Sequence, residues 1–393
     1  MPTGRRRRDR PRIRFRLTTA GWVFLASSLL VALVALNSGL ALLFVLFGCM
    51  LGALHVSAVL SRRMVAAVQV QRELPDRCRQ NQRVGLGYFL RSIRGGGACL
   101  ALRVEEMGLK DPKVPPAHCG CLPARQGHLS RTEMTPLRRG RVHFRGLRLC
   151  TTFPFGLIAA SRQFRRDASL VVWPGRGRLT APLLGRGEAH SAGVVPSIHA
   201  GGQDEFYGLR EYRLGDNARW IHWRRSAGRP EPVIREMARP RPQTLWVVLD
   251  TLLADRSRPA AARRERAIRF AATIIEDALA AGYRVGAVLA YEEKAIVVGP
   301  TDRRTQRQHL LDALADIDEN RTRPLADSLA RLRPGWLHMA HVVVIASGRD
   351  GEGLGPEALA RLRRDCHSLT IVTDDRIAEL YCDDPVASMQ EAG

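Results

Sequence analysis

Charged side chains are missing from one long part of this 393-residue sequence: the 45 residues from Leu17 to Ser61 contain no Asp, Glu, Lys or Arg. A helix needs about 20 apolar residues to cross the hydrocarbon core of a bilayer. The stretch therefore predicts two spans, at 18–36 and 40–60, joined at Asn37-Ser38-Gly39. Two full-length apolar cores exclude a cleaved signal peptide, and the length exceeds that of an ordinary core helix. Without charges to line a path, a transporter is also disfavoured.

Arginine is concentrated on both sides of the uncharged stretch. Arg5 to Arg8 and four further arginines precede it, and Arg62 and Arg63 follow it. Because such residues stay on the cytoplasmic side, we predict an inner-membrane protein of the bacterial type with both termini cytoplasmic. Residues 1–17 form its basic N-terminus and 18–61 its transmembrane hairpin. The lipid bilayer is then the first expected partner.

Lysine and aromatic residues are scarce in the rest of the chain. Of the 61 basic residues only Lys110, Lys113 and Lys294 are lysines, and the net charge is +23. With abundant Ala, Gly and Pro, this skew indicates a GC-rich coding bias as much as a binding surface. A basic body beside an anionic leaflet gains about 1 kcal/mol per well-placed arginine. No basic ribbon interleaved with aromatics is present, so we expect no nucleic-acid partner.

Motifs of known enzyme chemistry are also lacking. The sequence has no nucleophile elbow, no zinc-protease helix motif, no phosphate-binding loop and no Cys–His pair at a recognised spacing. Cys119 and Cys121 lack a second ligand pair at zinc-site spacing. We therefore predict a protein that is not an enzyme and has no cofactor. An envelope-modifying hydrolase of unknown chemistry stays open as the alternative.

Periodicity divides the soluble part into two kinds of structure, so the fold class is α+β and multi-domain. Short period-two runs separated by Gly and Pro predict an antiparallel β-sandwich at 64–176, followed by a linker at 177–202. From Thr244 onward, continuous apolar strands alternate with helical patterns. That alternation predicts a mostly parallel sheet with both faces covered. The expected strands are 245–250, 284–291, 294–298, 341–346 and 369–373. The expected helices are 259–281, 304–317, 323–333 and 356–365. Residues 379–393 are expected to form a tail.

The segment 203–240 is the densest in charge and tryptophan. Asp216 is placed to cap a helix, on which Trp220 and Trp223 would share one face. We favour a structural brace with both tryptophans in a core. The alternative is a docking surface, because Trp and Arg dominate interface hot spots. His222 has no nucleophile at a fixed offset, so catalysis here is disfavoured.

The same segment resembles a known family. The run Leu209-Arg-Glu-Tyr-Arg-Leu-Gly-Asp216, then Arg219, Ile221-His-Trp223 and Ser226-Ala227, is similar to the signature of the domain of unknown function 58 family. Upstream, Arg139 to Leu149 followed by Phe153-Pro-Phe-Gly-Leu-Ile158 resembles a second conserved segment of that family, and the two spans fit as well. His222 and Gly228 depart from the usual pattern. The signature residues are Arg210, Glu211, Tyr212, Gly215, Asp216, Arg219, Trp223 and Ser226.

The resemblance implies a von Willebrand factor A-like fold for 241–378. In that fold, an Asp-x-Ser-x-Ser motif binds metal after the first strand. Here Asp250 remains, but Leu252 and Ala254 replace the hydroxyls and offer no hard oxygen ligands for magnesium. We predict a degenerate site without metal.

The family resemblance also implies partners. Its members resemble partners of MoxR-type AAA+ ATPases and accompany other membrane proteins. The expected function is thus a membrane-anchored cytoplasmic interaction or scaffold protein in envelope-related assembly.

Overall fold

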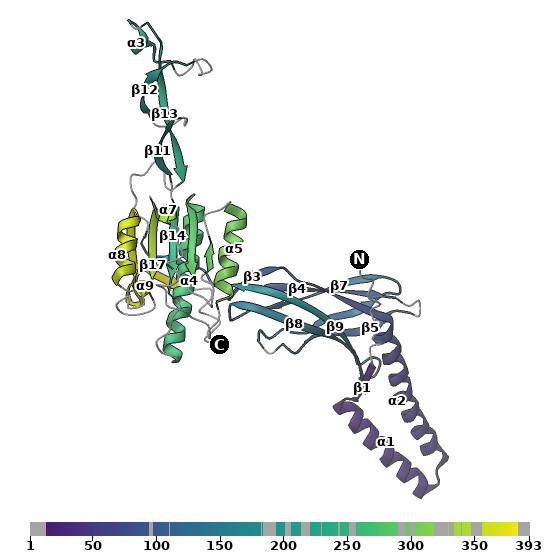
Figure 1. The fold of residues 1–393 in the computed structure, drawn as a ribbon. Coiled ribbons are helices and arrows are strands. Elements are labelled where there is room, and N and C mark those ends of the chain that lie inside the picture. The colour runs from purple at the N-terminus through teal and green to yellow at the C-terminus, as the bar shows by residue number, and fades with distance from the viewer. Residues whose placement is uncertain are drawn as a thin grey trace, which may run out of the picture. The chain divides into compact units, whose positions relative to one another are not determined.

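In a computed structural model of the chain, the structure describes residues 13–93, 97–109, 111–181, 183, 194–200, 206–213, 221–228, 230–242, 244–250, 257–289, 296–298, 303–317, 329, 334–338, 340–346 and 356–383. The chain divides into two compact units, Met1–Trp173 and Pro174–Gly393. Each unit is described by itself below (Figure 1).

Two long apolar helices open the first unit, which confirms that part of the prediction. Helix α1 spans Thr19–Ser38 and α2 spans Ala41–Ala67. Gly39 ends α1 in the left-handed conformation at φ 66°, and its N–H donates to the Ala35 carbonyl. A residue without a Cβ adopts that geometry at little cost. Both helices are long and apolar enough to cross a membrane. Helix α2 continues past the predicted span and places Val65 in a core.

Two antiparallel sheets complete this unit. The larger has the order β1-β9-β8-β5-β6, with β3 added in parallel to β9, and the smaller has the order β2-β4-β7. Their bounds are β1 Ile13–Leu17, β2 Val68–Glu73, β3 Arg77–Arg79, β4 Val84–Ser92, β5 Cys99–Met107, β6 Ala117–Leu122, β7 Gly127–Met134, β8 Gly140–Thr151 and β9 Ile158–Trp173. Residues 13–17, which fall in the predicted basic N-terminus, thus form an edge strand.

Alternating side chains of both sheets build one shared core. Val70, Leu86 and Leu90 from the smaller sheet pack with Leu102 and Leu149 from the larger one. Period-two burial of this kind is what the sequence pattern predicts. Inside the core lies a charged pair, Arg72 of β2 and Glu106 of β5, whose side chains are 3% and 2% exposed.

A mixed sheet forms the centre of the second unit, in the order β16-β15-β14-β17-β18. All neighbours are parallel except β16 at the edge, so the predicted mostly parallel sheet is confirmed. The strands are β14 Thr244–Leu249, β15 Arg284–Leu289, β16 Ile296–Val298, β17 Ala340–Ile345 and β18 Ser368–Val372; the helices are α4 Arg258–Ala280, α5 Arg303–Ala315, α7 Pro334–Leu337, α8 Pro356–Asp365 and α9 Asp374–Leu380. Most of the helix expected at 323–333 lies outside the described residues.

Short strands also form where a linker and a tail were expected. Strand β10, Gly177–Leu179, pairs antiparallel with β19, Tyr381–Asp383. The Tyr381 ring would overlap any side chain placed at Gly177, so the close approach requires glycine there. Strands of three residues with mixed composition carry too few periods to be recognised in a sequence.

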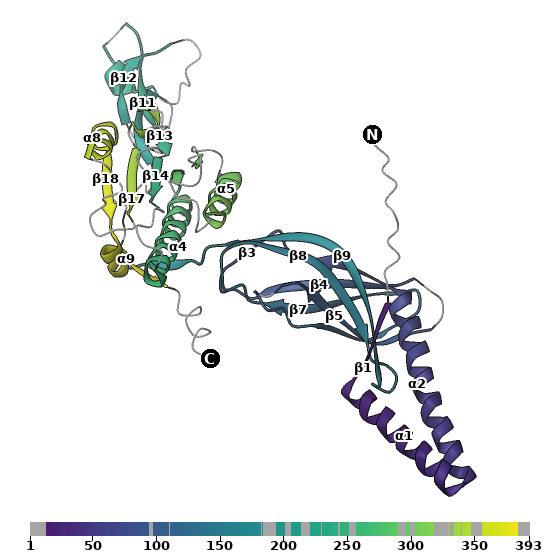
Figure 2. The same ribbon diagram turned by 60° about the horizontal axis from the view of Figure 1, so that its bottom comes forward.

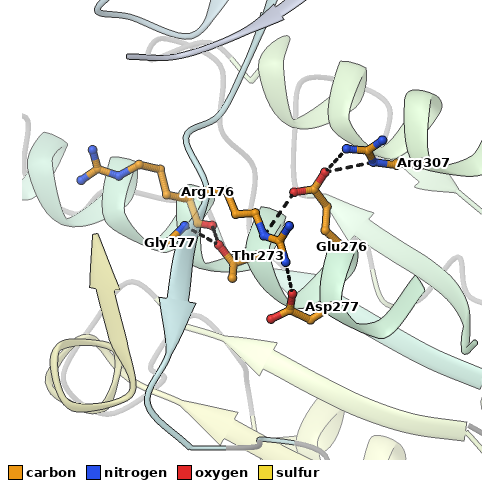
Figure 3. A network of polar contacts seen from close by, with 7 residues as sticks. Arg176, Gly177, Thr273, Glu276, Asp277 and Arg307 are labelled. Atoms are coloured by element: carbon orange, nitrogen blue, oxygen red, sulfur yellow. Dashed lines mark hydrogen bonds and ion pairs between the residues drawn. The ribbon is translucent and has the colours of Figure 1, made fainter. Parts of the chain in front are cut away.

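A polar network fastens β10 to helix α4 (Figure 3). Arg176 reaches Asp277 at 2.7 Å, and the Gly177 N–H donates to the Thr273 hydroxyl at 3.1 Å. The buried carboxylate of Glu276 lies 2.7 Å from Arg307 and 3.9 Å from Arg176. The two arginines are half-exposed, so the network lies at the rim of the unit.

Candidate interaction site

The signature segment folds as an antiparallel ribbon with a one-turn helix near its closed end. Strand β12, Phe206–Glu211, pairs with β13, Val233–Pro242, and β13 also pairs with β11, Val194–Ala200. Pairing continues past β12, because the Tyr212 N–H donates to the Pro232 carbonyl at 2.8 Å. Figure 1 shows helix α3, Trp223–Ser226, beyond the ends of β12 and β13.

Ser226 and His222 fix this helix to β13. The Ser226 hydroxyl accepts from the Val233 N–H at 2.9 Å and donates to the His222 carbonyl at 3.1 Å. The His222 N–H donates to the Val233 carbonyl at 2.8 Å, and its Nδ1 accepts from the Arg225 N–H at 3.3 Å. His222 is therefore the cap of α3, and Ser226 is the residue that positions it.

The favoured expectation of a core tryptophan is wrong for Trp223, which is 70% exposed. The reason is local pairing. Ile221 forms a bridge with Ile234, so the backbone is still extended there and a helix cannot run from Asp216 through this point. Helix α3 begins after this bridge, at Trp223. Arg224 and Arg225, next to it, are exposed as well.

The remaining signature residues fall into two groups. Arg210 and Glu211 lie in β12, and Tyr212 is half-buried just after it. Gly215, Asp216, Arg219 and Trp220 lie outside the described residues. The beginning of the signature, in β12, and its end, at Ile221 and Ser226, thus both contact β13.

Asp250 follows β14 at the carboxyl edge of the parallel sheet, where such sheets bind ligands. Its side chain is buried, and its N–H donates to the Ile345 carbonyl at 2.9 Å. The hydroxyl-free positions Leu252 and Ala254 lie outside the described residues. Within the part of the chain that the structure describes, no three His, Cys, Asp or Glu side chains gather as a metal site.

A serine–histidine pair that the sequence reading missed lies at the opposite edge of this sheet. His341 Nδ1 is 2.5 Å from the Ser368 hydroxyl, and the His367 ring packs edge-on against His341. Burial, followed by the charge of His367, lowers the pKa of His341. Both residues stand at the amino ends of their strands, away from the usual ligand edge. The pairing of β17 with β18 brings the two residues together. No local sequence motif predicts this contact.

The fold thus defines a chain with an apolar helical hairpin, a two-sheet antiparallel unit and a mostly parallel α/β unit that carries the signature ribbon. Residues 208–380 match the model of a family described as "Protein of unknown function DUF58". That match runs from within β12 to the end of α9 and so includes both the ribbon and the parallel sheet.

The chain is also similar to an uncharacterised bacterial protein and to a solved structure. The "Uncharacterized protein YeaD" of Bacillus subtilis (strain 168) is 23% identical over 243 residues, which cover 56% of this chain and 59% of that protein. The chain thus spans less than two thirds of that relative. The CARDB domain of PF1109 from Pyrococcus furiosus covers 27% of this chain and 94% of its own length, at 14% identity and a TM-score of 0.17. This last similarity is too low to bear on the fold.

Proposed function

We propose that this chain is a membrane-anchored interaction protein that presents its signature ribbon to a protein partner at the cytoplasmic face of the inner membrane. The observation that carries the proposal is the exposed Trp223 on a turn that Ser226 hydrogen-bonds to β13. A large exposed aromatic side chain on a fixed backbone loses little conformational entropy when it is bound.

The charge around Trp223 indicates the character of the partner. Arg224 and Arg225 follow it directly in the chain and are exposed. Trp and Arg are the residue types most enriched among interface hot spots. The ribbon therefore suits an apolar pocket with an acidic rim. Electrostatic attraction of that kind mainly raises the association rate and fixes orientation.

The anchor and the sheet support the same proposal. Helices α1 and α2 are of membrane-crossing length, and arginines on both sides favour cytoplasmic termini. The order β16-β15-β14-β17-β18, with an antiparallel edge strand, supports a von Willebrand factor A-like unit. From the family resemblance we propose a MoxR-type AAA+ ATPase as partner, with envelope-related assembly as the process.

A binding measurement tests the proposal directly. The purified full-length chain in detergent micelles is mixed with the MoxR-type ATPase of the same cell, and complex formation is followed by light scattering. We expect wild type to bind and Trp223→Ala to bind at least tenfold more weakly. The matched control is Leu137→Ala, which removes an exposed apolar side chain from the first unit and should bind as wild type does.

Two results would contradict the proposal. Wild type that forms no complex with the ATPase refutes this choice of partner. Equal binding by wild type and Trp223→Ala refutes the ribbon as the docking element.

A further inference from the structure

The loop between β8 and β9 is bonded to the first turn of α1, at the level where that helix would enter the membrane. The Thr18 N–H donates to the Leu157 carbonyl at 3.1 Å, and the Thr18 hydroxyl donates to the Gly156 carbonyl at 2.6 Å. Thr18 also caps α1 by accepting from the Gly21 N–H at 2.9 Å. Figure 2 shows the connection between β8 and β9 beside β1 and the start of α1.

The contact between loop and helix is close enough to need glycine. A Cβ at Gly21 would overlap the Leu157 carbonyl, so any larger residue would push the loop off the helix. Gly156 has φ 72° and donates its N–H to the Thr152 carbonyl at 2.8 Å, which closes the loop into a tight turn. The depth of this loop is therefore fixed relative to α1.

Three aromatic side chains around this contact are exposed. Phe155 at the loop tip is 58% exposed, Phe15 of the edge strand β1 is 49% exposed, and Trp22 in the first turn of α1 is 61% exposed. Exposed arginines lie on both sides of Phe15 in the sequence, at Arg14 and Arg16, and also where α2 leaves the uncharged stretch, at Arg62 and Arg63. Aromatic side chains with adjacent basic residues are typical of the headgroup layer of a cytoplasmic leaflet.

We infer that Phe155, Phe15 and Trp22 form an aromatic collar that inserts into the headgroup layer of the leaflet where α1 and α2 emerge, with the four arginines on anionic lipid phosphates. The collar restricts rotation of the two-sheet unit about the two helices and so holds that unit at one orientation on the bilayer. The occupant follows from continuity, because Phe15 and Trp22 of the collar lie where the apolar helix α1 begins. This inference rests on the membrane anchor of the proposed function.

Lipid cross-linking tests the collar. The full-length chain carrying a photoreactive benzophenone side chain at position 155 is reconstituted into vesicles of phosphatidylethanolamine and phosphatidylglycerol, irradiated and analysed by intact-mass spectrometry. A matched control carries the probe at Leu137, which is 51% exposed and precedes β8, whereas Phe155 follows it. A third protein carries it at Leu30, in the middle of α1.

We expect lipid adducts at positions 155 and 30 and none at 137. Adducts at 30 without adducts at 155 would overturn the collar while leaving the anchor in place. Equal adducts at 155 and 137 would also overturn it, because they would indicate nonspecific contact. No adduct at position 30 would refute the membrane anchor, and the collar with it.

Discussion

The two units of this chain bury charged groups on different kinds of element, strands in the first unit and a helix in the second. In the antiparallel unit, the Arg72–Glu106 pair lies in the shared core of two sheets, with Nε–Oε1 and Nη2–Oε2 distances of 2.8 and 2.6 Å. In the parallel unit, the strands are mainly apolar, and the buried charges Arg264 and Glu276 lie on helix α4 instead. Glu276 pairs there with half-exposed arginines. A parallel sheet buries both faces of its strands and leaves little room for charge. An antiparallel pair of sheets can instead fix its register with one internal ion pair.

The largest expected effect comes from the core pair. Glu106 also accepts from the Tyr88 hydroxyl at 2.9 Å, and burial together with that carboxylate raises the pKa of Tyr88. Replacing Glu106 by Ala leaves Arg72 buried without its carboxylate, which costs about 3–5 kcal/mol. Urea unfolding of the full chain in detergent, followed by hydrogen exchange of β4 and β5, measures this loss.

The matched control for that variant is Glu105→Ala. Glu105 is the neighbouring residue and pairs with Arg103 and Arg148 on a partly exposed face. An exposed pair contributes about 0–1 kcal/mol. If the two variants lose the same stability, the core pair does not hold the two sheets together.

A smaller loss is expected from packing in the parallel unit. A Cβ at Gly286 of β15 would lie 2.7 Å from the ring of Trp246, which is fully buried. Gly286→Ala therefore overpacks the core, at about 1–3 kcal/mol. Gly85→Ala in β4 is the control, because no atom lies within 4 Å of its added Cβ. Unfolding midpoints measured by circular dichroism should fall for the first variant only.

The pH dependence of the parallel unit provides a third comparison. Burial lowers the pKa of His341, so the unfolded chain takes up a proton there more readily than the folded one. The contribution of neutral His341 to the free energy of unfolding is therefore fully present above about pH 6.5, the ordinary histidine pKa. This contribution is lost as the pH falls from there to the pKa of His341 in the folded protein. His341→Gln should lose less stability between pH 7.5 and 5.5 in thermal unfolding. An unchanged loss would contradict the assignment to His341.

The rim network should tolerate substitution far better than the core pair does. Arg176 is 50% exposed, and Glu276 keeps Arg307 when Arg176 is replaced. Solvent screening limits such a pair to about 0–1 kcal/mol, so Arg176→Ala should lower the free energy of unfolding by no more than that. Urea unfolding is again the measurement. A loss as large as that of Glu106→Ala would remove the contrast between the two units.

Sequence reasoning succeeded where burial is continuous and failed where pairing is long-range. The runs that became β14 and β17 are apolar on both faces, so their pattern predicts them within one residue. The uncharged stretch likewise predicts α1. By contrast, Arg72 and Glu106 are 34 residues apart, and each looks like an ordinary polar position in an alternating strand. The periodicity of the two strands therefore does not predict their contact.

The signature ribbon shows the same limit. The spacing of Trp220 and Trp223 is helical, but the bridge from Ile221 to Ile234 joins residues that only the fold brings together. Helix α3 begins after that pairing, at Trp223, whose side chain is exposed. The residues of the candidate site could thus be listed from the sequence, whereas their exposure could not.

The smallest expected effect on stability is at Trp223 itself, and its neighbour Ser226 makes it measurable. An exposed side chain away from special features changes stability by about 0.5 kcal/mol or less, so Trp223→Ala should leave hydrogen exchange along β13 unchanged. Ser226→Ala removes the acceptor of the Val233 N–H, and Val233 is buried; an unsatisfied buried donor costs about 1–3 kcal/mol. Exchange at Val233 should therefore accelerate in Ser226→Ala only. If Trp223→Ala accelerates exchange at Val233 equally, the tryptophan stabilises the ribbon. Weakened partner binding by Trp223→Ala would then no longer identify Trp223 as a contact residue.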